Sequence, residues 1–200
     1  MNKEIETALK EAAAALPGAA ALDLERVAAE GLLDVAYASV DSPLGTLVVA
    51  STPRGLVRLA YTGSRSEDEV IEDLAERLSP RVLEAPQRLD EVRRELEEYF
   101  EGKRDHFDVP VDWALTSPGF RSRALHAVAR IPYGKTKTYA EIAKSAGNER
   151  AFRAAGTACG RNAIPLIVPC HRVLQSGGGV GNYGGGPEMK RALLDLEGAL

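Results

Sequence analysis

The spacing of hydrophobic residues changes near residue 35. Over residues 4–16 the apolar positions recur every three or four residues, which predicts a short amphipathic helix that ends at Pro17 and Gly18. From Val35 the chain carries short strand-like runs, separated by turns that contain proline and glycine, at 35–40, 46–51 and 55–62. This pattern predicts a small antiparallel sheet.

Two charged segments follow the strands, at about 66–78 and 87–101, and both have the hydrophobic spacing of an amphipathic helix. Residues 103–116 resemble a connection out of this region. The expected fold class is therefore α+β. We expect an N-terminal helical extension at 1–33, an α/β domain at 34–112 and a mostly helical domain at 113–200.

The second half has the spacing of a helix-turn-helix. Ser117, followed by proline, predicts the start of a helix that runs to Ile131. Thr138 and Glu141 form a capping box at the start of the next helix, which should end at a Gly-Asn pair. A further helix is expected at 150–160. Two helices joined by a short turn with glycine are typical of DNA-binding proteins.

Charge is distributed unevenly over the 200 residues, whose formal net charge is −4. Residues 1–115 hold 13 Lys and Arg against 24 Asp and Glu, whereas residues 116–200 hold 12 against 5. A basic half beside an acidic half is expected when only one part meets a polyanion. A chance distribution over solvated faces is the alternative.

The helix expected at 150–160 is rich in small residues and carries Arg150 and Arg153. Small side chains allow a helix to lie close to a nucleic-acid backbone, although a buried helix also favours alanine. The basic half favours a nucleic-acid contact. The residues predicted to contact DNA are Ala151, Arg153, Ala154, Gly156, Thr157 and Arg161.

Cys170 lies between a proline and a His-Arg pair, after an apolar run and before a glycine-rich loop. A free thiol is only a few per cent thiolate at pH 7, so a nucleophilic cysteine needs a base, a cation or amide dipoles. His171 could serve through a water molecule, and Glu197 is the candidate carboxylate that orients it. The alternative is a buried structural thiol, which is our interpretation of Cys159.

The cysteines, the histidines and the glycine-rich motif bear on which other classes of protein the chain could belong to. Two cysteines eleven residues apart suit a reducing compartment, and the histidines and cysteines show no zinc-site spacing, so we expect no structural metal. No leader or membrane-spanning stretch is recognised, which predicts a soluble, cytoplasmic protein. The motif Gly179-x-Gly181-x-x-Gly184 lacks the βαβ context of a dinucleotide site.

Taken together, these segments resemble the O6-alkylguanine-DNA alkyltransferases, also called methylated-DNA–protein-cysteine methyltransferases. The resemblance covers roughly residues 117–198 and rests on "IPYGKTKTYAEIA", "GNERAFRAAG", "RNAIPLIVPCHRVL", "GVGNYGGG" and "LLDLEG", in the family's order. The stretch "SPLGTLVVASTPRGLVRLAY" is similar to the family's less regular N-terminal domain.

The resemblance implies a role for each matching residue. Cys170 would accept the alkyl group, His171 and Glu197 would form a water-linked relay that deprotonates it, and Asn162 would brace the turn. Tyr139 would donate a proton to the guanine ring, and Arg153 would fill the space left by the everted nucleotide. The substrate pocket would comprise Pro165, Val173, Tyr183 and Gly184, with backbone groups of Cys170 and Val173 reading the guanine amine.

The implied activity is direct repair of double-stranded DNA that carries O6-alkylguanine, and possible repair of alkylated thymine stays open. Each molecule, expected to be a monomer, would react once because a thioether has no obvious way back, and no cofactor is required. One departure is Gly184, where the family often has serine, which implies altered substrate handling.

Two alternatives stay open at this point. A lesion-sensing or regulatory helix-turn-helix protein would bind DNA without chemistry, but such relatives are expected to lack the acceptor cysteine. A cysteine hydrolase with Cys170, His171 and Glu197 as a triad would turn over repeatedly, and it leaves Arg153 and the charge distribution unexplained.

Overall fold

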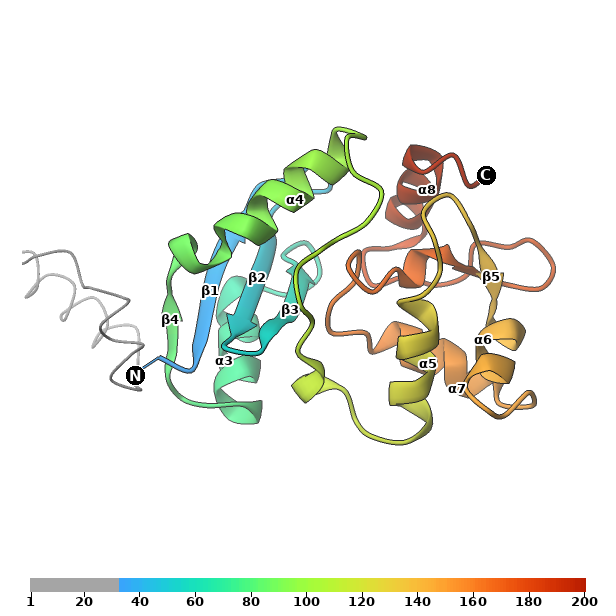
Figure 1. Cartoon of the computed structure of the whole chain (residues 1–200), viewed down its shortest axis with the longest axis horizontal. Helices are drawn as coiled ribbons and strands as arrows, with labels where there is room; N and C mark the ends of the chain where they lie inside the picture. The colour runs from blue at the N-terminus through green and yellow to red at the C-terminus, as the bar shows by residue number, and fades with distance from the viewer. Residues whose placement is uncertain (1–32) are drawn as a thin grey trace, which may run out of the picture. The chain divides into compact units, whose positions relative to one another are not determined.

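A four-stranded sheet forms the first half of the computed structural model, which describes residues 33–200 (Figure 1). The strand order is β3-β2-β1-β4, with β1 at Val35–Val40, β2 at Leu47–Thr52, β3 at Gly55–Tyr61 and β4 at Val82–Glu84. The three predicted strands are confirmed as an antiparallel set, and the helix predicted at 4–16 lies outside the described residues. β4, which was not predicted, pairs parallel with β1, so the sheet is mixed.

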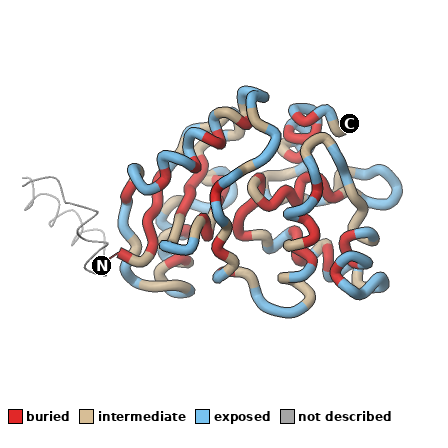
Figure 2. Tube along the Cα trace, viewed as in Figure 1, coloured by how far each residue is buried: buried red, intermediate tan, exposed pale blue. Residues whose placement is uncertain are grey.

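Helices cover the sheet and complete the α+β class that the sequence predicted. The first four residues of β1 and of β2 are all buried, which shows that both faces of the sheet are covered. Helix α3 (Glu67–Arg77) buries Val70 and Leu74, and a 3-10 turn, η1 (Pro86–Leu89), leads into α4 (Asp90–Phe100). Figure 2 shows the buried stretches running along the strands and on through the helices of the second half.

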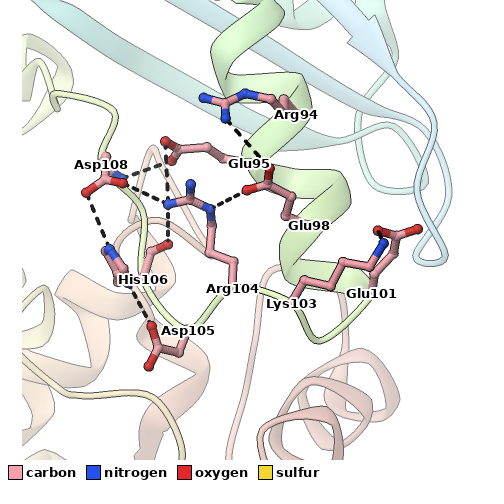
Figure 3. Close-up of polar contacts among 9 residues, drawn as sticks. All are labelled: Arg94, Glu95, Glu98, Glu101, Lys103, Arg104, Asp105, His106 and Asp108. Carbon is pink, nitrogen blue, oxygen red and sulfur yellow. Dashed lines mark hydrogen bonds and ion pairs between the residues drawn. The ribbon is translucent and has the colours of Figure 1, made fainter.

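An ion-pair network fixes the connection that leaves α4 (Figure 3). The Arg104 guanidinium lies 2.9 Å from a Glu98 oxygen and 2.9 Å from an Asp108 oxygen, and 3.6 Å from the buried Glu95. Glu95 also accepts a hydrogen bond from the Asp108 amide at 2.9 Å. The chain is thereby directed along β3, where a side chain at Gly55 would lie 2.3 Å from the Pro110 carbonyl oxygen, so that only glycine fits.

The second half consists of helices and one pair of short strands. After the 3-10 turn η2 (Trp113–Leu115), the elements are α5 at Phe120–Val128, β5 at Lys137–Thr138, α6 at Tyr139–Ser145, α7 at Phe152–Gly160, the 3-10 turn η3 at Cys170–Arg172, β6 at Val173–Leu174 and α8 at Pro187–Leu196. Strands β5 and β6 are parallel.

The predicted helix-turn-helix is formed by α6 and α7. The capping box is present, because Thr138 Oγ1 accepts from the Glu141 amide at 3.2 Å and the Glu141 carboxylate accepts from the Thr138 amide at 2.7 Å. The turn contains Gly147 at φ +84°, a conformation that favours glycine. The predicted start of α5 at Ser117 is wrong. Gly119 precedes the helix at φ +89°, and the Ser117 hydroxyl accepts from Arg121 instead.

Direct contacts join the sheet to the second half, and residues 35–200 form one compact unit. The Leu59 amide on β3 donates to the Ala163 carbonyl at 2.9 Å, and the Tyr99 hydroxyl on α4 donates to Glu197 at 2.6 Å. Among the described helices, none has the length and apolar character needed to cross a bilayer. The sheet is therefore tied to the loop and the carboxylate that surround Cys170.

Candidate active site

Cys170 lies at the start of η3, and only 4% of its surface is exposed. The Asn162 side-chain amide donates to the Cys170 sulfur at 3.2 Å and to the Val168 carbonyl at 2.7 Å. The Asn162 side-chain oxygen accepts from the Ile164 amide at 3.1 Å. One asparagine thus connects the end of α7, the loop that follows it and the thiol.

The loop before the cysteine has an unusual backbone. Leu166 has φ +72°, the only positive value at a non-glycine residue in the part of the chain that the structure describes. A left-handed leucine costs about 1–2 kcal/mol, and it persists where the surrounding structure determines it. The Leu166 side chain is 1% exposed, so burial together with the Asn162 bonds holds this conformation. No pattern in the sequence predicts this conformation.

The Glu197 carboxylate, at the end of α8, is buried and accepts several hydrogen bonds. The donors are His171 Nε2 at 2.8 Å, Tyr99 at 2.6 Å, the Gly134 amide at 3.3 Å, and Arg172 through Nε and Nη2 at 2.9 Å each. Burial alone favours the neutral acid, but the hydrogen bonds from His171 and Arg172 lower the pKa of Glu197 to about 2. Glu197 is therefore ionised at neutral pH.

This carboxylate sets the tautomer of His171. An ionised carboxylate can only accept, so Nε2 carries the proton and Nδ1 holds a lone pair. Nδ1 is buried and has no hydrogen-bond partner among residues 33–200. Burial lowers the pKa of His171, against the opposing effect of its bond to Glu197, so the ring is neutral. The site thus holds an uncharged imidazole with one free basic nitrogen.

The thiol itself is protonated in this resting arrangement. Burial raises the pKa of Cys170, and the hydrogen bond from Asn162 and the charge of Lys190 offset only part of that rise. Burial likewise raises the pKa of Cys159, which lies on the buried face of α7 with Ala155 and Ala158. Cys170 differs from Cys159 in having the Asn162 side chain as a hydrogen-bond donor to its sulfur and an imidazole beside it in the chain.

Lys190 is a site residue that the sequence reasoning missed. It is fully buried on α8, its ammonium group donates to the Val173 carbonyl at 2.5 Å, and it lies 5.7 Å from the centre of the Tyr139 ring. Burial lowers the pKa of Lys190. The signal was its spacing, because Lys190 precedes Leu193, Leu194 and Glu197 by three, four and seven residues and so shares their buried face.

A cavity of about 400 Å³ lies among α6, α7 and the loop that follows β6. It is lined by Tyr139, Gly156, Gly160, Gln175, Asn182, Tyr183 and Gly184. Burial, with smaller effects from the two cysteines, raises the pKa of Tyr139 to about 12, so its hydroxyl remains a donor at neutral pH. The structure thus brings Tyr139, Tyr183 and Gly184 together, while Pro165 lines the neighbouring cavity and Gln175 and Asn182 were not predicted.

Two details of the expected pocket are changed by the structure. The Val173 carbonyl already accepts from Lys190, which leaves one of its two lone pairs for a ligand. At Gly184 a side chain would meet nothing within 4 Å, so the absence of serine there is not imposed by packing. The Tyr183 hydroxyl lies 2.6 Å from that of Tyr61 on β3, which anchors the loop to the sheet.

The predicted DNA-contact residues on and beside α7 differ in how exposed they are. Arg153, Ala154, Thr157 and Arg161 are exposed, and Ala151 and Gly156 are partly buried. Phe152 was missed, although it is 49% exposed and its ring lies 5.8 Å from the Arg153 guanidinium carbon. An exposed aromatic residue beside an arginine gives this helix an apolar and a cationic group on one surface.

Known proteins match both halves of the chain. Residues 35–113 match the family model "6-O-methylguanine DNA methyltransferase, ribonuclease-like domain", and residues 119–199 match "6-O-methylguanine DNA methyltransferase, DNA binding domain".

Similar whole proteins carry the same names. The chain is 37% identical over 161 residues to a methylated-DNA–protein-cysteine methyltransferase of Methanosarcina barkeri, covering 80% of this chain and 96% of the relative. It is 41% identical over 152 residues to the inducible enzyme of that name from Bacillus subtilis, covering 74% and 82%. A crystal structure of Mycobacterium tuberculosis OGT in complex with DNA matches with a TM-score of 0.71 and 37% identity, covering 82% and 93%. The chain therefore belongs to the 6-O-methylguanine DNA methyltransferase family.

Proposed function

We propose that this protein repairs DNA by moving the alkyl group of O6-alkylguanine to the sulfur of Cys170, once per molecule and without a cofactor. The observation that carries the proposal is the His171 ring, which Glu197 holds with Nδ1 free, next to a buried thiol. Family membership and the printed names of the relatives support the same reaction.

The reaction begins with the thiol proton. His171 Nδ1 takes this proton from Cys170 through a water molecule, and the imidazolium that forms is stabilised by the ionised Glu197 2.8 Å away. The Asn162 amide and the buried Lys190 charge favour the thiolate. Because burial raises the pKa of Cys170, the thiol stays protonated until His171 removes its proton during the reaction.

The thiolate then attacks the alkyl carbon in line with the bond to guanine O6. The S–C bond forms while the C–O bond breaks, and its electron pair passes into the guanine ring. Tyr139 donates a proton to a ring nitrogen, so guanine leaves as a neutral base. The raised pKa of Tyr139 means that its hydroxyl still carries this proton at neutral pH. The products are guanine in DNA and a thioether at Cys170.

The target nucleotide must leave the duplex to reach the cavity, at a cost of a few kcal/mol. We assign Arg153 and Phe152 to the space that it vacates, because both are exposed at the start of α7. The small residues Ala151, Ala154 and Gly156 permit close approach to the strand, and Thr157 and Arg161 lie farther along the same helix. The partner is double-stranded DNA bound by a monomer in the cytoplasm. Of the two domains, 34–112 and 113–200, the second carries the reactive cysteine and the helix that enters the DNA.

A mass measurement tests the proposal. Tryptic cleavage after Arg161 and Arg172 separates the two cysteines, since Cys159 falls in the preceding peptide. Incubation with a methylated-guanine duplex should add one methyl group to the Cys170 peptide, with a total of one per protein molecule. Cys170→Ala should remove this product and Cys159→Ala should keep it. A methyl group on Cys159, or repeated turnover as a hydrolase would show, contradicts the proposal.

A further inference from the structure

A second cavity, of about 450 Å³, adjoins the cavity proposed for guanine, and Gly160 and Gly184 line both. It lies between β3 and α3 on one side and the loop that contains Asn162 and Pro165 on the other. The charged side chains that line it are Arg58, Arg65, Arg77, Arg121, Arg161 and Asp73.

The arginines are not neutralised by their neighbours. Asp73 is the only acidic residue in the lining among residues 33–200, and its carboxylate is shared by Arg58 at 3.4 Å, Arg77 at 3.5 Å and Arg65 at 4.0 Å. Arg121 contacts the Ser117 hydroxyl at 3.1 Å, which carries no charge. Five guanidinium groups against one carboxylate leave the cavity strongly positive.

Arg58 points to a missing ligand. Its side chain is 12% exposed, and its Nε is buried without a hydrogen-bond partner anywhere in the part of the chain that the structure describes. Burial lowers the pKa of Arg58, and the charges of Arg65 and Arg77 add to this lowering while Asp73 opposes it. Buried donors are nearly always bonded in folded proteins, so an anion with several acceptor oxygens would satisfy this nitrogen.

The source of these arginines is informative. Arg58, Arg65 and Arg77 belong to the acidic first half of the chain, in which Arg54, Arg93, Arg94 and Arg104 each pair with a carboxylate outside the cavity. Planar guanidinium groups bind phosphate oxygens in pairs, and arginine is the residue best suited to that task. A nucleotide everted into the neighbouring cavity remains attached to its strand through its flanking phosphates, and the two cavities meet at Gly160 and Gly184.

We propose that this arginine cavity binds one backbone phosphate of the damaged strand, next to the everted nucleotide. The proposal rests on the proposed function and extends it, because the first half of the chain then contacts DNA directly. A free phosphate ion offers the same chemistry as a backbone phosphate, so the test must separate the two sources.

The test measures binding of a duplex with one O6-methylguanine over a series of salt concentrations. Each phosphate contact contributes about 0.9 to the slope of log K against log salt concentration. Arg58→Gln should make the slope shallower by about 1. If Arg58→Gln fails to fold, Arg121→Gln gives the same test, because Arg121 lies at the partly exposed edge of the cavity. Arg94→Gln on α4, which removes an exposed arginine 3.6 Å from Glu98, should leave the slope as it is.

A second arm locates the phosphate. Single phosphates around the lesion are replaced by neutral methylphosphonates. One replacement should weaken binding to the wild-type protein and have a smaller effect on Arg121→Gln, because this variant has already lost one of the guanidinium groups that face the phosphate. If every replacement weakens both proteins equally, the cavity does not hold a backbone phosphate.

Two further measurements separate the possible failures. If inorganic phosphate binds the wild-type protein but not Arg121→Gln, while the duplex slope is the same for both, the ligand is free phosphate and the DNA assignment is wrong. Methylation of Cys170 by free O6-methylguanine base tests the alkyl transfer alone. If the wild-type protein does not react with the free base, the proposed function is wrong. If the variants keep the wild-type salt slope, only the assignment of a phosphate to the arginine cavity is wrong.

Discussion

At the scale of single residues, Glu197 controls the charge state of the site. It accepts hydrogen bonds from both His171 and Arg172, so its negative charge fixes the imidazole tautomer and compensates the guanidinium. Replacing the carboxylate by an amide changes charge while keeping size. The consequences should appear both at the thiol and in the stability of the fold.

Glu197→Gln should raise the pKa of the Cys170 thiol further, because an amide no longer stabilises the imidazolium that accepts the proton. The rate of iodoacetamide labelling at Cys170, followed against pH, should shift to higher pH than in the wild-type protein. Glu188→Gln, an exposed position on the same helix, is the control and should match the wild type. A coincident profile for Glu197→Gln would contradict the relay.

The pKa of Glu197 also predicts how stability depends on pH. Because this pKa is lowered from 4.5 to about 2, the unfolded chain takes up the proton first, and the carboxylate stabilises the fold above pH 4.5. That contribution is lost as pH falls from 4.5 toward 2. Urea unfolding at a series of pH values should show this loss in the wild-type protein and a flatter dependence in Glu197→Gln.

At the scale of elements, α7 combines two exposed groups that act on the duplex and not on the chemistry. Arg153→Ala and Phe152→Ala should each slow repair of methylated duplex, by about tenfold or more, if each contributes at least 1.4 kcal/mol to holding the nucleotide out. The reaction with free O6-methylguanine base should fall much less. Arg93→Ala, on α4 and paired with Asp90, is the control for charge.

The elements show what sequence patterns can predict. The short apolar runs from Val35 to Tyr61, separated by turns that contain proline and glycine, identify the strands, and the Thr138–Glu141 capping box fixes the start of α6. Strand β4 was missed because its three residues are mostly exposed and pair with a strand far away in the chain. The start of α5 was misplaced because Gly119, with its positive φ, and not Ser117 sets it.

Site residues were predictable where a motif marked them and hidden where only folding brings them together. Cys170 and His171 could be predicted together, because a nucleophilic cysteine needs a base and His171 is its neighbour in the chain. Tyr99 and Glu197 are separated by 98 residues, and no local pattern connects them. The arginine cavity was hidden for the same reason, because its members come from β3, α3 and the second half.

At the scale of the whole molecule, the bond from Tyr99 to Glu197 joins the two halves through the reactive centre. Tyr99→Phe removes a buried donor to a charged acceptor, so the free energy of unfolding should fall by about 1.5–3 kcal/mol, measured by urea titration. Alkyl transfer should slow with little change in DNA affinity. Tyr133→Phe, which loses a more exposed bond to the Leu196 carbonyl, should cost less than Tyr99→Phe.

The Tyr99 hydroxyl also limits how freely such proteins can be recombined. A chimera that kept the second half intact but borrowed its sheet and α4 from a relative would keep every α7 residue predicted to touch DNA. Unless the borrowed helix offered a donor at this same place, the carboxylate at the end of α8 would lose its shortest hydrogen bond. The two halves are thus separate in sequence but not interchangeable as parts.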